Sequence, residues 1–140
     1  MPYLNDPACY SDNARLFPHL LARVFKAVAA AEGGVVIHCS AGRDRSGMIA
    51  AMLQDLTGDN DEAIVRGYQR SMRGINEHLR HAAVPHPHER FLPENVLVPL
   101  LESRGKSLLH FVRSLNTADY LVRHGVTSEE LAAILGKLGR

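Results

Sequence analysis

The segment VVIHCSAGRDRSG, residues 35–47, governs the fold expected for this chain. Its first three residues are apolar and β-branched, which is typical of a short buried strand. Residues 38–47 are expected to form a loop, and the apolar run at 48–56 a buried helix. A strand, a loop and a helix in this order indicate an α/β fold in which the loop joins the end of the strand to the start of the helix.

The same loop carries residues suited to binding and attacking a phosphate group. Backbone N–H groups of the loop and of the following helix can point at one site, where they favour a phosphate dianion or a thiolate. The pKa of Cys39 is therefore expected to be depressed. Arg45 can hold two phosphate oxygens through its planar guanidinium, and the Ser46 hydroxyl can hydrogen-bond the Cys39 sulfur. Gly42 permits a tight turn, and His38 is expected to hold the cysteine in position.

The rest of the chain is predicted to be mainly helical. A helix is expected to begin at Asp12 or Asn13 and to end before Gly33, because apolar residues recur there every three or four positions. Residues 1–11 and 81–95 contain several prolines and are expected to be loops. Further helices are predicted at 61–80, at 96–101 with Pro99 in the first turn, at 107–115, at 117–124 and, opened by a capping box, at 127–138.

Length and composition favour one globular domain over residues 1–140. The chain has 140 residues, of which 46% are hydrophobic and 22% charged, an ordinary composition for a soluble protein. A net charge of +1 argues against a nucleic-acid partner held by a broad basic face. The apolar run at 96–101 is too short to cross a bilayer. Two cysteines without paired spacing favour a reducing, cytoplasmic compartment.

The sequence HCSAGRDRSG resembles the loop HCxAGKDRTG of a bacterial tyrosine-phosphatase family. The resemblance extends to MIAAMLQDLTG, EAIVRGYQRS and TADYLVRHGVTSEELAAILGKL. Arg43 stands where this family has lysine and Ser46 where it has threonine, so the charge and the hydroxyl are kept. The resemblance implies a phosphate monoester hydrolase that acts on phosphotyrosine through a cysteinyl-phosphate intermediate. Some members also accept phosphoserine, phosphothreonine or phosphoinositides, and no metal or cofactor is expected.

The resemblance and the loop chemistry together give a set of site residues. The catalytic residues are expected to be Cys39, Arg45, Asp44 and Ser46, with His38 in support. Asp44 is the favoured general acid, and Asp6 on a separate loop is the alternative. The phosphate-binding residues are expected to be Ser40, Ala41, Gly42, Arg43, Asp44 and Arg45. Two other functions remain open: a catalytically impaired phosphate-binding fragment or interaction module, and a sulfurtransferase.

Related proteins carry additional N-terminal residues that contribute further strands. The resemblance therefore implies an N-terminally truncated cysteine-phosphatase fold, mostly helical, with a small residual parallel sheet. A lone strand at 35–37 would leave its backbone groups unpaired. Three explanations are open: residues 1–11 pair with it, a second chain pairs with it, or the coding sequence begins too late. A homodimer through an exposed sheet edge is predicted.

Other clusters have weaker interpretations. Four histidines crowd one region, but no carboxylate or cysteine completes a metal site, and they are expected to lie near a substrate lid: His78, His81, His86 and His88. Four arginines share the helix at 61–80 and form either a solvated face or a rim for an acidic phosphopeptide or inositol headgroup: Arg66, Arg70, Arg73 and Arg80. Cys9 is interpreted as an incidental thiol or, alternatively, as a resolving cysteine for Cys39.

Overall fold

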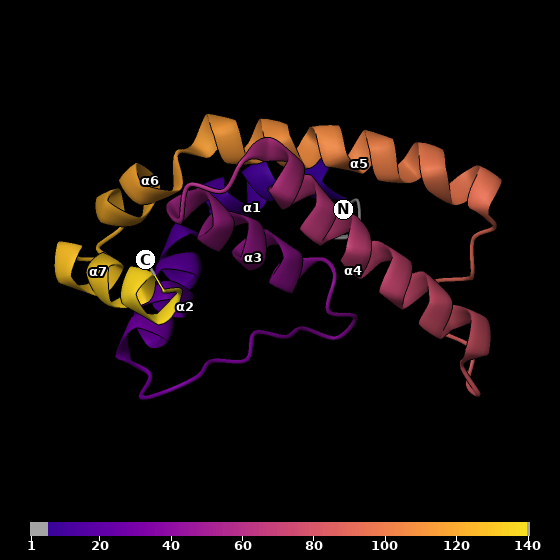
Figure 1. Cartoon of the computed structure of the whole chain (residues 1–140), viewed down its shortest axis with the longest axis horizontal. Coiled ribbons are helices and arrows are strands. Elements are labelled where there is room, and N and C mark those ends of the chain that lie inside the picture. The colour runs from indigo at the N-terminus through magenta and orange to yellow at the C-terminus, as the bar shows by residue number, and fades with distance from the viewer. Residues whose placement is uncertain (1–5, 140) are drawn as a thin grey trace.

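A computed structural model describes residues 6–139, which form helices joined by loops (Figure 1). Helix α5 runs along one side of the molecule with α4 packed against it. Helices α2 and α7 pack together at the end of the molecule where α6 lies. The elements are η1 (Pro7–Cys9), α1 (Tyr10–Leu16), α2 (Pro18–Ala30), α3 (Arg45–Leu56), α4 (Asp61–His81), α5 (Glu94–Leu115), α6 (Thr117–Arg123) and α7 (Ser128–Lys137).

The predicted parallel sheet is wrong for the described residues, because 6–139 contain no strand. Residues 35–37 lie in a connection between α2 and α3 that is neither helix nor strand (Figure 1), and Val36 is 87% exposed rather than buried. A strand exists only when a second extended segment accepts its backbone hydrogen bonds, and no described segment does so here. The sheet edge expected to form a homodimer is therefore also missing from the described chain.

The N-terminal region is more helical and more broken than predicted. Pro7–Cys9 form the short helix η1 and α1 begins at Tyr10, so the loop expected for residues 1–11 is wrong from Pro7 onward. Positions 1–5 lie outside the described residues. The single helix predicted to end before Gly33 is divided into α1 and α2 at Phe17. Pro18 explains this break, because a residue before proline is disfavoured in the helical conformation.

Two helices predicted at 96–101 and 107–115 are one continuous helix, α5. Pro99 lies inside it rather than in its first turn, on the exposed side. The residues that α5 buries recur every three or four positions, so one apolar face runs along the helix and outweighs the cost of the proline. These buried residues are Leu97, Leu101, Gly105, Leu108, Phe111 and Val112.

Helix α3 begins at Arg45, so the loop predicted for residues 38–47 is wrong at 45–47. The helices predicted at 61–80, 117–124 and 127–138 are confirmed as α4, α6 and α7. Asn60 caps α4 by accepting a hydrogen bond from the Ala63 N–H at 2.8 Å. The capping box that was predicted for the last helix is present, with Thr127 and Glu130 bonding each other's backbone N–H groups. These caps satisfy N–H groups that a helix start otherwise leaves unpaired.

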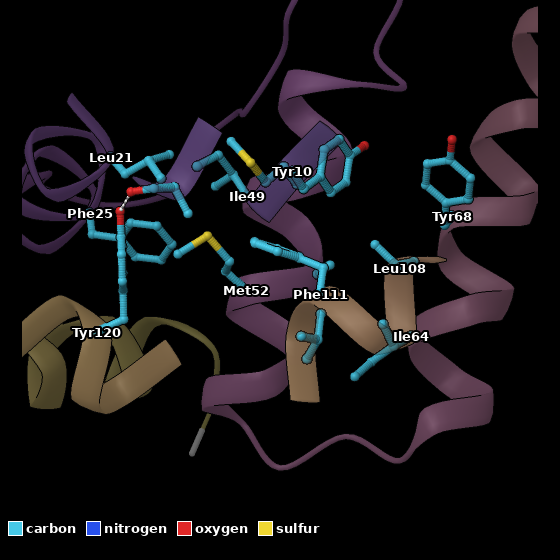
Figure 2. Close-up of a cluster of buried hydrophobic side chains, with 14 of the residues drawn as sticks. Tyr10, Leu21, Phe25, Ile49, Met52, Ile64, Tyr68, Leu108, Phe111 and Tyr120 are labelled. Atoms are coloured by element: carbon cyan, nitrogen blue, oxygen red, sulfur yellow. Dashed lines mark hydrogen bonds between the residues drawn. The ribbon is translucent and has the colours of Figure 1, made fainter. Parts of the chain in front are cut away.

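The hydrophobic core holds the start of α3 in place. Figure 2 shows side chains from α1 to α6 converging on one cluster, with Met52 of α3 near its centre. The ring of Tyr10 meets Phe111 edge-on, with 5.5 Å between centroids. Met52, Ile64 and Leu108 are fully buried. Because α3 begins at Arg45, this packing also fixes the position of the preceding loop.

Candidate active site

The sulfur of Cys39 accepts hydrogen bonds from several donors at the start of α3. Its Sγ lies 3.3 Å from the Ser46 hydroxyl oxygen. Burial raises the pKa of the Cys39 thiol, but bonds from the Ser46 hydroxyl and from the backbone N–H groups of Ser46, Gly42 and Arg43 lower it from its ordinary 9.0 to about 6. A thiol with this pKa is mostly thiolate at neutral pH, which is the form that attacks electrophiles.

Arg43 is buried between two carboxylates. Its Nε and Nη2 donate to the two oxygens of Asp44 at 2.8 and 2.9 Å. Its Nη1 and Nη2 donate to the two oxygens of Glu89 at 3.0 and 2.7 Å. Burial lowers the pKa of the Arg43 guanidinium, but these bonds outweigh it and raise that pKa above its usual range. The guanidinium of Arg43, which was expected to bind phosphate, is thus occupied by protein carboxylates, and Arg43 offers the sulfur its backbone N–H.

The two candidate acids have different surroundings. The Asp44 carboxylate is held by Arg43 and makes no capping bond to α3. The Asp6 carboxylate caps η1 by accepting a bond from the Ala8 N–H at 2.9 Å, and its other oxygen lies 3.9 Å from Nε of Arg104. The assignment of Asp44 or Asp6 as the general acid stays a prediction.

Tyr10, the first residue of α1, contacts the backbone of the loop. Its hydroxyl donates to the backbone oxygen of Asp44 at 2.8 Å. At Gly47, a Cβ atom would lie 3.4 Å from the Tyr10 hydroxyl and 3.5 Å from the Tyr68 ring, so the glycine allows both tyrosines to approach α3 closely. Sequence analysis missed Tyr10, because it lay in a region predicted to be a loop and carries no motif linking it to residues 38–47.

Arg45 is exposed and makes no hydrogen bond or ion pair within residues 6–139. It borders a cavity of about 280 Å³ that is otherwise lined mainly by apolar side chains, including Phe17 between α1 and α2, Leu20 of α2 and Met48 of α3. The His38 ring nitrogen Nδ1 lies 3.3 Å from the backbone oxygen of Cys39. The roles predicted for Arg45, His38, Ser40 and Ala41 stay predictions.

The segment at 82–93, which brings Glu89 to the loop, has a fixed local structure. The buried Asn76 of α4 bonds both backbone groups of Leu92, at 2.8 and 3.0 Å. The Nδ1 atom of His86 accepts bonds from the backbone N–H groups of His88 and Glu89, at 3.1 and 3.0 Å. Sequence analysis did not select Glu89, since a carboxylate in a proline-rich loop carries no signal of a partner 46 residues away.

Most of the arginines on α4 that were predicted to form a basic face are paired with acidic side chains. Arg66 pairs with Glu62 at 2.7 Å and Arg73 with Glu94 at 2.9 Å. Arg80 lies 3.9 Å from Glu77, and its guanidinium stacks over Phe91. Within the described residues, no group of three histidine, cysteine or acidic side chains could hold a metal ion. Cys9 and Cys39 are both free thiols.

An activated cysteine in a loop at a helix start, with backbone N–H groups directed at its sulfur, is typical of phosphatases that use a cysteine nucleophile. Comparison with known proteins agrees: the chain belongs to the tyrosine phosphatase family, whose family model matches residues 7–139.

One curated relative that matches is a "Tyrosine-protein phosphatase" of Nostoc commune. The two are 47% identical over 47 residues, which cover 33% of this chain and 16% of the relative. The match thus spans about a sixth of that protein's length. No solved structure matches this chain. Among the described helices, none is both long and apolar enough to span a membrane.

Proposed function

We propose that the protein hydrolyses phosphate monoesters, with phosphotyrosine in a protein as the leading substrate and Cys39 as the nucleophile. The observation that carries this proposal is the set of hydrogen-bond donors around the Cys39 sulfur, which lower the pKa of its thiol. A phosphate dianion bound beside the sulfur needs the same donors, so a single loop serves the nucleophile and the substrate.

The proposed reaction has two steps. In the first, the Cys39 thiolate attacks phosphorus, a sulfur–phosphorus bond forms, and the bond from phosphorus to the tyrosyl oxygen breaks. Arg45 and the loop N–H groups hold the three equatorial oxygens, whose charge grows in the transition state. In the second step, water attacks phosphorus, the sulfur leaves as a thiolate, and inorganic phosphate is released. The Ser46 hydroxyl stabilises the departing thiolate from 3.3 Å.

A proton must reach the leaving oxygen in the first step, and the same group must accept one from water in the second. We propose Asp44 for this role and retain Asp6 as the alternative. Asp44 lies in the same loop as Cys39, next to the start of α3. For Asp44 to donate, its carboxyl group has to exchange at least one of its bonds to Arg43 for the substrate oxygen.

A phosphopeptide is preferred over a phosphoinositide as substrate. A multiply charged inositol headgroup is bound best by several free basic side chains. Three of the four arginines on α4 are already engaged by acidic residues, as is the guanidinium of Arg43. Arg45 is the loop arginine whose guanidinium is unpaired in the described chain, which suits a single phosphate group.

Turnover of p-nitrophenyl phosphate by the full chain tests the proposal. We expect hydrolysis that falls by about 10³-fold or more in Cys39→Ser, whereas the matched variant Cys9→Ser keeps wild-type activity. We also expect iodoacetate to alkylate Cys39 at pH 6, and inorganic phosphate to protect it. Asp44→Asn is expected to slow release of poor leaving groups such as tyrosine, while Asp6→Asn is not.

A folded protein without turnover that depends on Cys39 would contradict hydrolase activity and favour a phosphate-binding module. Alkylation of Cys39 only above pH 8 would contradict the proposed nucleophile. Loss of activity in Asp6→Asn with retention in Asp44→Asn would reverse the assignment of the acid.

A further inference from the structure

The loop that contains Cys39 has little backbone support of its own. Residues 32–43 make no backbone-to-backbone hydrogen bond within the described chain. Gly42 has a positive φ of 70°, a conformation that glycine adopts at little cost and leaves easily. The N–H groups of Gly42 and Arg43 nevertheless have to stay directed at the Cys39 sulfur. Side-chain contacts must therefore supply the rigidity that the backbone lacks.

Arg43 is the strongest side-chain anchor in this loop. Its side chain is only 7% exposed, and its guanidinium makes two bonds to each of two carboxylates. Asp44 is the adjacent residue, so its bonds to Arg43 tie the loop only to itself. Glu89 lies 46 residues away on another segment. Together with the bond from the Tyr10 hydroxyl to the Asp44 backbone oxygen, the pair of Arg43 with Glu89 therefore fixes the loop to distant segments of the molecule.

Glu89 is itself firmly placed. Its N–H bonds the ring of His86, and Arg90 donates to the backbone oxygens of His86 and Glu89. The Asn76 side chain ties the segment to α4 through its two bonds to the backbone of Leu92. The Leu92 side chain packs against the hydrophobic core. A fixed carboxylate can hold a buried guanidinium at one position.

We propose that Glu89 is a positioning residue for the active-site loop: through the buried guanidinium of Arg43, it holds the backbone of residues 42–44 against the Cys39 sulfur. The proposal deepens the function proposed above, since its consequence for catalysis rests on Cys39 being the nucleophile. The effect of Glu89 on the loop does not depend on that function, because the pH at which Cys39 is alkylated depends on the donors around its sulfur whether or not the protein is a phosphatase. Removing Glu89 leaves the buried Arg43 with one carboxylate, an arrangement that favours its exposure to water.

The pair of Arg73 with Glu94 provides a matched control. It has the same two-bond geometry, at 2.9 and 3.2 Å, but its side chains are 48% and 66% exposed. It also links two segments, α4 and the start of α5, without touching the loop. A substitution there removes a similar ion pair and leaves the Cys39 sulfur unaffected.

The experiment measures the rate at which iodoacetamide alkylates Cys39 as a function of pH, in a Cys9→Ser background. In Glu89→Gln we expect the midpoint of this profile to rise by about one pH unit, which lowers reactivity at pH 6 about fivefold. Glu94→Gln is expected to keep the wild-type midpoint. Far-ultraviolet circular dichroism checks that both variants are folded. Where Glu89→Gln does not fold, Glu89→Asp keeps the charge with a shorter reach and is expected to shift the midpoint in the same direction by less.

An unchanged midpoint in a folded Glu89 variant would overturn the proposal, as would an equal shift in Glu94→Gln. The two proposals fail separately. If the midpoint responds to Glu89 and the wild type has no phosphatase activity, the positioning role stands and the hydrolase function does not. If the wild type turns over p-nitrophenyl phosphate and the midpoint ignores Glu89, the reverse holds. For an active enzyme, we expect Glu89→Gln to lower kcat at pH 6 more than at pH 8.

Discussion

Two kinds of donor act on the sulfur of Cys39. The backbone N–H groups of Gly42, Arg43 and Ser46 are fixed by the path of the chain, whereas the Ser46 hydroxyl can rotate. A donor that rotates can bond the thiolate before attack and follow it as the thiolate leaves in the second step. The buried position of Ser46, which is 8% exposed, keeps competing water away from this hydroxyl.

Removing the Ser46 hydroxyl is expected to raise the pKa of Cys39. In Ser46→Ala the sulfur loses one hydrogen bond to its charged form, so the midpoint for alkylation should rise from about 6 by about one pH unit. The loss of thiolate is then greatest between these two midpoints, so reactivity falls most between about pH 6 and 7. The control is Ser103→Ala on the exposed side of α5, and an identical profile for both variants would contradict the role of the hydroxyl.

The site residues that sequence analysis found are those within one local segment. Cys39 and Ser46 are seven positions apart, so a loop followed by a helix start was enough to predict their contact. Tyr10 and Glu89 contact the same loop from 34 and 46 residues away. Neither has a local pattern that indicates this, because packing of distant segments brings them there.

At the scale of elements, α4 and α5 approach closely where α5 has a buried glycine. A Cβ atom on Gly105 would lie 3.1 Å from Cγ1 of Val65, so the absence of a side chain permits this crossing. Gly74 lies on the exposed side of α4 and has nothing within 4 Å of its Cβ position. The two glycines have the same helical conformation and opposite surroundings.

Substitutions at these glycines are expected to have opposite signs. Gly74→Ala should stabilise the protein by about 0.5–1 kcal/mol, because alanine loses less backbone entropy than glycine in a helix. Gly105→Leu should destabilise it by about 1–3 kcal/mol, because the added side chain overpacks the crossing. Urea denaturation measures both free energies of unfolding. A Gly105→Leu variant as stable as the wild type would show that α4 and α5 can separate without cost.

Helices were easier to predict from sequence than the expected strand, for a physical reason. The bonds of α4 and α7 lie within each helix, and their caps are encoded by Asn60 and by Thr127 with Glu130. Residues 35–37 have a local preference for a strand, but a strand needs a partner from elsewhere in the chain. Pro18 and Pro99 show that the effect of a proline also depends on distant packing. Pro18 follows the end of α1, whereas Pro99 lies inside α5.

At the scale of the molecule, contacts between distant segments hold the two ends of the chain together. Tyr120 of α6 donates its hydroxyl to the backbone oxygen of Ala14 in α1 at 2.6 Å, across 106 positions. Lys26 of α2 pairs with Glu130 of α7 at 3.0 Å. The first contact is buried and the second is partly exposed, so the tyrosine is expected to contribute more to stability.

Two tyrosine substitutions separate this hydrogen bond from burial of the ring. Tyr120→Phe removes the hydroxyl and leaves the Ala14 oxygen without that donor, which should cost about 1–2 kcal/mol of unfolding free energy. Tyr68 is equally buried, but its hydroxyl makes no hydrogen bond of regular geometry within residues 6–139, and its nearest polar interaction is with Arg104. Tyr68→Phe is therefore expected to cost less unfolding free energy than Tyr120→Phe, because it removes a weaker interaction and no longer buries a poorly satisfied hydroxyl.

The two variants are compared by urea denaturation, with the slope of the transition checked for two-state unfolding. Equal losses would contradict the expected difference between the two hydroxyls, and no loss in Tyr120→Phe would contradict the contribution of the contact between α6 and α1. A loss of unfolding free energy in Tyr120→Phe alone would show that the bond from Tyr120 to Ala14 helps to keep α1 packed against the core. Tyr10, in the first turn of α1, bonds the backbone of the Cys39 loop. A less firmly held α1 should therefore let the loop adopt several positions, so Tyr120→Phe should also broaden the pH profile of Cys39 alkylation. Tyr68→Phe should leave that profile unchanged.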